Sequence, residues 1–232
     1  MKKIFALAMT LVLALTAACA LGENEGAIVQ SSCSIVQSGE YYLVYCFAQV
    51  HNNTDEIICL EKGSFDLQSG EQILATNTVN QIWPYFINPG EDGYLFDVVT
   101  IEPDENGNPV VPAITGISYQ IEYMSVNSAF ANRNLEVSAT LNDGPEGLSV
   151  LCRLTNNGSE DAFEPSVSFG LYTETGSMVY ADGTTLPGVG IPAGSTVLLR
   201  FDVENVFSDQ WRSAGFMPTE VRLNATYRND ED

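Results

Sequence analysis

The strongest constraint on the fold is an internal repeat with a constant offset of 104 residues. Its anchors are Asn52-Asn53 with Asn156-Asn157, Phe65-Asp66-Leu67 with Phe169-Gly170-Leu171, Gly90 with Gly194, and Tyr123 with Tyr227. A fixed internal period indicates one structural unit used twice. In a chain of 232 residues this gives two units of about 100 residues each, a common size for a domain.

Hydrophobic periodicity in both units indicates β-strands. Apolar and polar residues alternate along 117–124, a pattern typical of a strand with one buried and one solvated face. One inward row occurs in both units at the same offset: Val44, Cys46, Ala48 and Val50 match Leu148, Val150, Cys152 and Leu154. Several short strands separated by turn residues predict a β-sandwich in each unit. After residue 19 the sequence lacks a sustained helical period, and only 206–212 has the pattern of a short helical turn.

The predicted fold class is therefore all-β, with two β-sandwich domains in tandem. The first domain covers residues 28–125 and the second covers residues 132–229. The linker between them is short, so we expect it to restrict their relative orientation.

The N-terminus has the pattern of an export signal. A basic start at Lys2 and Lys3 precedes an apolar run, Ile4 to Leu15, that is too short for an ordinary membrane-spanning helix. The segment Leu15-Thr16-Ala17-Ala18-Cys19 resembles the lipobox of bacterial lipoproteins, in which the cysteine becomes the lipidated N-terminus. The resemblance implies a lipoprotein signal peptide at 1–19, lipid attachment at Cys19, a tether at 20–27, and a place on the outer face of the bacterial cell membrane. Thr16 stands where the family has a large aliphatic residue, so plain secretion is the alternative.

A motif in the second unit resembles a known family. Phe169-Gly170-Leu171-Tyr172 is similar to the signature of the FxLYD family of bacterial immunoglobulin-like domains, with Thr173 in place of the final Asp. The Asn156 turn before it and the Pro192-Ala193-Gly194 turn after it agree with that pattern, whereas the first unit keeps only Phe65-x-Leu67. The resemblance covers roughly 148–203 and implies two tandem immunoglobulin-like domains. The resemblance implies no catalytic residue in this chain, because a shared fold does not give a shared function.

The charge of the chain excludes some partners. It has 30 acidic and 9 basic residues, a formal net charge of −21. Lys2 and Lys3 lie in the leader, which leaves a net charge of −23 on the mature chain. Nucleic acids bind to lysine and arginine through their phosphates, so we predict no nucleic-acid partner. Such a surface also favours solubility.

Residues for catalysis are few. His51 is the single histidine, and hydrolytic and metal sites need partners for a histidine. The sequence has no Gly-x-Ser-x-Gly elbow, no Walker loop and no dinucleotide-binding fingerprint. We therefore predict no catalytic residue, no cofactor and a protein that is not an enzyme.

The cysteines are compatible with a disulfide. A Cys-x-x-Cys pair is missing, which argues against a zinc site. In an exported protein Cys46 could pair with Cys33 across a hairpin turned at Ser38-Gly39, or with Cys59 across the Asn53 turn. Both pairings stay open, because disulfide geometry is strict and the sequence does not fix it. Cys152 lies on an inward row and is expected to be a buried small hydrophobe.

Two groups of residues are candidates for binding. Asp104, Asn106 and Asn108 are spaced as at the start of a calcium loop, but the downstream glutamate and flanking helices of an EF-hand are missing, so an ordinary polar loop is the simpler interpretation. Tyr45 and Phe47 should point away from the inward row, and Trp83 flanks Pro84 together with Tyr85 and Phe86. Exposed aromatic side chains can bind sugar or peptide. The alternative is that these rings pack the other sheet or the contact between the two units.

These observations predict a non-enzymatic cell-surface lipoprotein that acts as an extracellular binding or interaction module. Its partners would be the membrane, through the lipid, and an extracellular protein or glycan. The alternatives are a calcium-stabilised structural module and, as a further class, a secreted hydrolase with a carboxylate pair.

Overall fold

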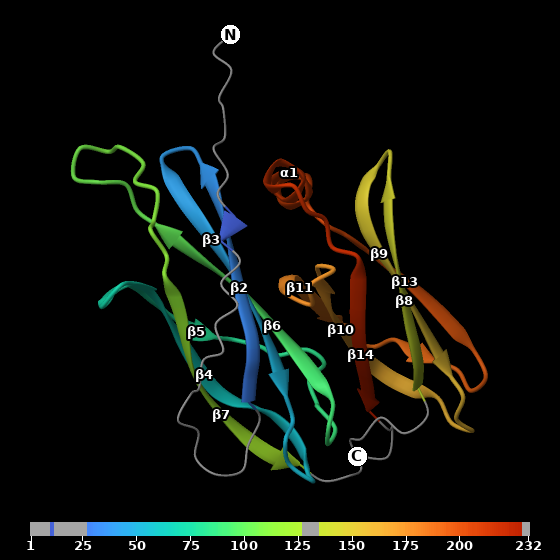
Figure 1. Ribbon diagram of the computed structural model, residues 1–232. Coiled ribbons are helices and arrows are strands. Elements are labelled where there is room, and N and C mark those ends of the chain that lie inside the picture. Colours follow the sequence, from blue (N-terminus) through green and yellow to red (C-terminus); the bar gives the residue numbers. More distant parts are fainter. Residues whose placement is uncertain (1–9, 12–26, 127–134, 229–232) are drawn as a thin grey trace.

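A computed structural model of the protein describes residues 10–11, 27–126 and 135–228 (Figure 1). The predicted lipid attachment at Cys19, nearly all of the predicted export signal and tether, and residues 127–134, which include most of the predicted linker, lie outside the described residues.

Within these ranges the chain forms antiparallel strands and one helix. The strands are β1 (Thr10–Leu11), β2 (Ala27–Ser38), β3 (Tyr41–His51), β4 (Ile57–Ser69), β5 (Gln72–Val79), β6 (Asp92–Ile101), β7 (Gly116–Val126), β8 (Leu135–Gly144), β9 (Gly147–Asn156), β10 (Ala162–Tyr172), β11 (Met178–Thr185), β12 (Gly190–Ile191), β13 (Thr196–Asp202) and β14 (Glu220–Arg228), and the helix is α1 (Asn205–Ala214). The prediction of an all-β fold is confirmed. No helix in the described part of the chain is long and apolar enough to span a membrane.

The first half consists of two facing sheets. One has the strand order β1-β2-β3-β6 and the other β5-β4-β7. The predicted inward row of β3, from Val44 to Val50, is buried between them and packs with Phe65, Leu67 and Tyr119. β2 and β3 form the predicted hairpin, with Gly39 in the turn at a φ of 64°.

The second half has the same construction. Its sheets have the orders β13-β9-β8 and β11-β10-β14, and the short β12 pairs with the start of β10. The row from Leu148 to Leu154 is buried, as predicted.

The predicted short helical turn is a helix of ten residues, α1. Phe207 and Trp211 lie four residues apart, which places both on one face of the helix, and both are buried. Gly215 ends the helix at a φ of 84°, a left-handed conformation that glycine adopts without steric cost.

The repeat is visible atom by atom at two buried asparagines. Asn52 Nδ2 donates to Glu56 O at 2.7 Å and to Ile87 O at 2.9 Å, while its Oδ1 accepts from Thr54 N at 2.9 Å. Asn156 Nδ2 donates to Glu160 O at 2.7 Å and to Ile191 O at 2.8 Å, while its Oδ1 accepts from Gly158 N at 2.9 Å. Every partner is displaced by the same 104 residues, so the two turns are copies of one structure.

The four sheets form successive layers (Figure 1). The layer β2-β3-β6 of the first half lies next to the layer β11-β10-β14 of the second half, and the sheets β5-β4-β7 and β13-β9-β8 lie on the two outer sides. α1 lies at one end of the space between the halves. The candidate site is built at this contact.

Candidate functional site between the two halves

Aromatic side chains fill the contact between the halves. Phe47 on β3 is fully buried, with its ring centroid 5.0 Å from that of Tyr180 on β11. Tyr45 on β3 meets the edge of Phe207 on α1 at 4.9 Å. Phe47 and Tyr94 belong to the same hydrophobic cluster as Phe169 and other core residues of the second half. Phe47 is thus buried and Tyr45 is partly exposed, and both rings pack between the units and do not form an open binding face. Because Tyr45 and Phe47 alternate with the inward row, the sequence correctly predicts that their side chains point away from the first half's core. It does not show that the second half covers them.

Two glycines let the sheets approach closely. A Cβ atom on Gly170 of β10 would lie 2.6 Å from the ring of Tyr94, and one on Gly183 of β11 would lie 2.5 Å from Cβ of Trp83. Separations this short do not occur between non-bonded carbon atoms, so any side chain at either position would displace an aromatic residue. Trp83 thus packs against β11 and is only partly exposed.

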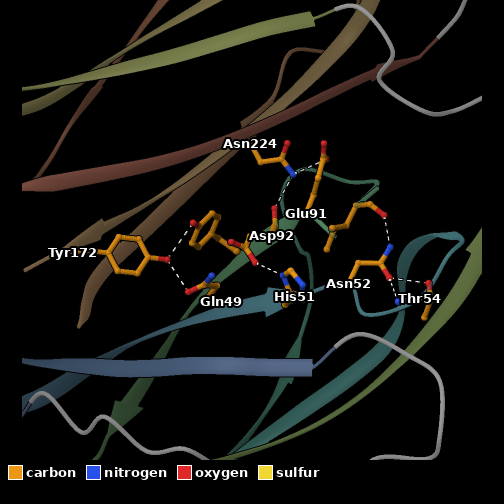
Figure 2. Close-up of polar contacts among 10 residues, drawn as sticks. Gln49, His51, Asn52, Thr54, Glu91, Asp92, Tyr172 and Asn224 are labelled. Atoms are coloured by element: carbon orange, nitrogen blue, oxygen red, sulfur yellow. Dashed lines mark hydrogen bonds and ion pairs between the residues drawn. The ribbon is translucent and has the colours of Figure 1, made fainter. Parts of the chain in front are cut away.

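The motif tyrosine Tyr172 joins the halves through a buried polar contact (Figure 2). Its Oη donates to Oε1 of Gln49 at 2.8 Å and lies 3.1 Å from Oη of Tyr94. Burial raises the pKa of Tyr172 to about 12, so the phenol stays a neutral hydrogen-bond donor at physiological pH. The guanidinium of Arg222 lies 4.0 Å from the centre of the Tyr172 ring.

His51 takes part in a second polar contact beside this one (Figure 2). Its Nδ1 lies 2.8 Å from Oδ1 of Asp92, the residue directly opposite on β6. Asn224 of β14 donates to the carbonyl oxygen of Asp92 at 2.7 Å and to Oε2 of Glu91 at 3.2 Å. No serine, threonine or cysteine within the described ranges is hydrogen-bonded to His51 as a nucleophile would be. The pair therefore ties β3 to β6 next to the contact between the halves.

A pocket of about 410 Å³ opens at the same junction. Its lining comes from both halves: Gln81, Tyr85 and Phe86 from the first, and Glu164, Ser166, Thr185, Thr226 and Tyr227 from the second. Tyr85 is 47% exposed, whereas Phe86 and Tyr227 are nearly buried. The volume lies within the range of small-molecule sites, about 300–1,000 Å³.

Hydroxyl groups line the pocket in one row. Ser166 on β10 lies directly between Thr185 on β11 and Thr226 on β14. Ser166 Oγ accepts from the backbone N–H of Tyr85 at 3.0 Å and from Thr185 Oγ1 at 3.1 Å. Thr226 Oγ1 is fully buried and has no hydrogen-bond partner among the described residues. A buried hydroxyl without a partner costs about 1–3 kcal/mol, which makes it a point where a water or a ligand gains a hydrogen bond.

A bulge places a carboxylate at the pocket. Pairing of β10 with β14 shifts register between Phe163 and Ser166, so Glu164 and Pro165 protrude from the ladder. Glu164 has a φ of 45°, the single positive value among the described residues other than glycine. Bulges commonly redirect a side chain near a functional site, and a left-handed backbone costs roughly 1–3 kcal/mol at such a residue.

A larger hollow of about 710 Å³ lies on the second half alone, between the turn 173–177 and the end of α1. The hydroxyl groups of the turn satisfy one another: Thr173 Oγ1 lies 2.9 Å from Thr175 Oγ1, which lies 3.5 Å from Ser177 Oγ. It presents no unpaired buried group, so the pocket at the junction is the better candidate.

The candidate calcium loop is an ordinary turn in this structure. Asp104 Oδ1 accepts hydrogen bonds from the backbone N–H of Asn106 at 2.9 Å and of Asn108 at 2.8 Å. These bonds lower the pKa of Asp104, and the amide of Asn108 points its NH₂ group at the same carboxylate. Donors occupy the oxygens that a cation would need. Across the described residues there is no cluster of three or more histidine, cysteine or acidic side chains that could hold a metal ion.

The four described cysteines are buried thiols. Cys33 and Cys46 are directly opposite on β2 and β3. Cys59 lies in a separate cluster with Ile57 and Phe86. Cys152 is part of the second half's core, as predicted from its place on an inward row.

Comparison with models of known protein families gives no match, and comparison with curated protein sequences gives no significant match. The resemblance to the FxLYD family therefore stays a prediction from the motif.

Sequence reasoning missed most of the pocket. Of its lining, the sequence singles out only Tyr85 and Phe86, as neighbours of Trp83 at Pro84. The unusual Glu164-Pro165 step inside a strand was the available signal, because proline in a strand interior indicates a bulge or an edge. Nothing local indicated that Ser166, Thr185 and Thr226 would line up across three strands.

Proposed function

We propose that this protein is a non-enzymatic, lipid-anchored bacterial surface protein in which two immunoglobulin-like β-sandwich domains bind an extracellular ligand at their junction. The pocket lined by both halves is the observation that carries the proposal. The lipobox-like segment at Cys19 supports the anchor, and the duplicated sandwich-like halves with the Phe169–Tyr172 motif support the domain assignment.

The chemistry of the pocket favours a neutral glycan. Tyr85 provides the exposed aromatic surface against which the C–H face of a sugar ring can stack, and the nearly buried Phe86 and Tyr227 add smaller areas to the wall. The hydroxyl row and Gln81 match the mixed donors and acceptors of sugar hydroxyls. Glu164 and the net charge of −21 disfavour anionic ligands.

Calorimetric titration of the purified protein with neutral oligosaccharides of glucose, mannose, galactose and N-acetylglucosamine tests the assignment. We expect binding by at least one of them and a loss of about tenfold or more in Tyr85→Ala, because Tyr85 is the exposed wall of the pocket. The matched control is Ile73→Ala on the outer strand β5, where the side chain is 55% exposed and does not line the pocket; it should bind like the wild type.

Two results would contradict the proposal. The first is a folded protein that binds none of these oligosaccharides at millimolar concentration. The second is binding that Tyr85→Ala leaves unchanged. If a surface protein is captured instead and its capture depends on Tyr85, the glycan assignment is wrong while the pocket keeps its role.

Metabolic labelling with a radioactive fatty acid tests the anchor separately. The wild type should incorporate label and partition with membranes, and Cys19→Ala should do neither. Label retained in Cys19→Ala would contradict lipid attachment at this residue.

A further inference from the structure

Ionisable side chains form a row across the core of the first half. Cys33 on β2 is directly opposite Cys46 on β3, which is directly opposite Asp97 on β6. Residues directly opposite on antiparallel strands point to the same face of the sheet. Both cysteines belong to the core cluster that includes Tyr119 of the facing sheet.

The second half shows that the fold does not require this chemistry. The positions equivalent to Cys46 and Asp97 are Val150 and Phe201, which pair directly with each other, and Leu141 is opposite Val150 on the other side. The same row is thus apolar in one half and holds two thiols and a carboxylate in the other. One property that two opposed thiols have and an apolar pair lacks is the ability to form a disulfide.

The geometry of Cys33 and Cys46 fits a disulfide. Directly opposite Cα atoms on antiparallel strands lie about 4.5–5.5 Å apart. A disulfide spans Cα separations of about 4.4–6.8 Å. Cys59 and Cys152 lie in other clusters, so the register selects one pair from the alternatives that the sequence left open.

We propose that Cys33 and Cys46 are a redox pair that closes a disulfide between β2 and β3 when a small-molecule disulfide is available outside the cell. One thiolate attacks the external disulfide and releases one thiol, forming a mixed disulfide. The second thiolate then attacks the protein sulfur of that mixed disulfide and releases the second thiol. The pair loses two protons and two electrons, and the external disulfide is reduced to two thiols that carry them.

Burial decides when this exchange takes place. Cys33 is 2% exposed and Cys46 is 1% exposed. Burial raises the pKa of Cys33 to about 11 and that of Cys46 well above its ordinary value, so the folded protein holds very little reactive thiolate. The bond therefore forms while the hairpin is still accessible during folding. Once closed in the core, it is shielded from external reductants.

Mass mapping of the full chain tests the pairing without any substitution. The reduced chain is refolded in a buffer of reduced and oxidised glutathione, unfolded in the presence of an alkylating agent, and cleaved after glutamate. Glu40 separates Cys33 from Cys46 and Glu56 separates Cys46 from Cys59, whereas trypsin leaves all three in one peptide. We expect linked peptides containing Cys33 and Cys46, with Cys59 and Cys152 alkylated. Alkylation of all four, or a link from Cys46 to Cys59, would overturn the proposal.

Kinetics and stability give a second, independent readout. Folded reduced protein placed in the same buffer should oxidise at least about tenfold more slowly than the unfolded chain. Heating the oxidised protein with a reductant present should lower its melting temperature by about 5 °C or more, because the reductant reaches the bond once the chain unfolds. Cys59→Ala should keep this dependence on reductant and Cys46→Ala should lose it. Equal oxidation rates, or a dependence that survives in Cys46→Ala, would contradict a shielded Cys33–Cys46 bond.

Discussion

The two halves share their turns and cores but use opposite faces to contact each other. The first half contributes its β2-β3-β6 sheet, whose counterpart in the second half, β8-β9-β13, is an outer layer. The second half contributes β10-β11-β14, whose counterpart in the first half is the outer sheet β4-β5-β7. A duplicated unit has therefore paired two non-equivalent surfaces.

When two non-equivalent surfaces of one unit pair, further copies of the unit can add in the same way and form an open chain, because each added copy leaves one unpaired surface. The outer faces of this protein prevent that. Phe96 of the contact corresponds to Arg200, which is exposed and ion-paired to Glu146 at 3.2 Å and to Asp202 at 2.6 Å. Gly170 of the contact corresponds to Asp66, a charged residue where close approach would be needed. Equivalent positions of the two halves thus carry an apolar or small residue where the sheet is covered and a charged residue where it faces solvent.

The connection between the last two strands also differs. In the first half, residues 102–115 form the loop that contains Asp104. The equivalent residues of the second half contain α1, whose Phe207 packs on Tyr45 and whose Gln210 donates to the carbonyl oxygen of Ile35 at 3.0 Å. The helix therefore contributes to the contact, and the loop that replaces it in the first half does not.

The largest loss of stability is expected from truncating Tyr94, an aromatic residue in the contact between the halves. Tyr94→Ala should lower the free energy of unfolding by about 3–5 kcal/mol, because it leaves a cavity between the halves and removes the partner of Tyr172. The equivalent residue Leu198 is 60% exposed, so Leu198→Ala should change stability by no more than about 0.5 kcal/mol. Urea unfolding of both variants measures the difference, and similar losses would mean that the contact adds little stability.

The duplicated turns should respond alike. Asn52→Ala and Asn156→Ala each leave two backbone carbonyl oxygens without their side-chain donor, which should cost about 2–3 kcal/mol in either half. The exposed neighbour Asn53, replaced by Ala, is the control and should have a small effect. Losses at the two buried positions that differ by more than about 1 kcal/mol would show that the halves are not energetically equivalent.

A smaller and pH-dependent effect is expected at Asp97, the counterpart of Phe201. Burial raises the pKa of Asp97 to about 6, so between about pH 4 and pH 7 the folded chain holds this proton more tightly than the unfolded chain does. Stability from this group is present at low pH and is lost as the pH rises through about 6, by up to about 2 kcal/mol after allowance for partial exposure.

Asp97→Asn should remove this pH dependence, and Asp97→Phe tests whether the apolar row of the second half can be restored. Thermal unfolding of the wild type and both variants across this pH range is the measurement. A wild-type slope that persists in Asp97→Asn would assign the effect to another group.

The smallest effect is expected from calcium. Because N–H donors already occupy the Asp104 carboxylate, millimolar calcium should shift the melting temperature by less than about 1 °C. Asp104→Ala, compared with the wild type in calcium and in chelator, controls for general charge screening. A clear increase in the wild type that is lost in Asp104→Ala would restore the calcium-stabilised alternative.

Much of the local structure followed from the sequence. The alternation along 117–124 and the inward rows of β3 and β9 were correct, because side chains on one face of a strand recur at every second residue. The full length of α1 was underestimated, because its helical period is short and its apolar face is completed by contacts from the other half.

The sequence by itself determined the repeat, the strands and which residues point into each core, since these depend on neighbours along one strand. It left open what Tyr45 and Phe47 meet, which cysteines face each other, and where Ser166, Thr185 and Thr226 come together. Those were decided by register and by the stacking of two non-equivalent sheets, because a face that points outward from one half has no defined environment until the other half covers it.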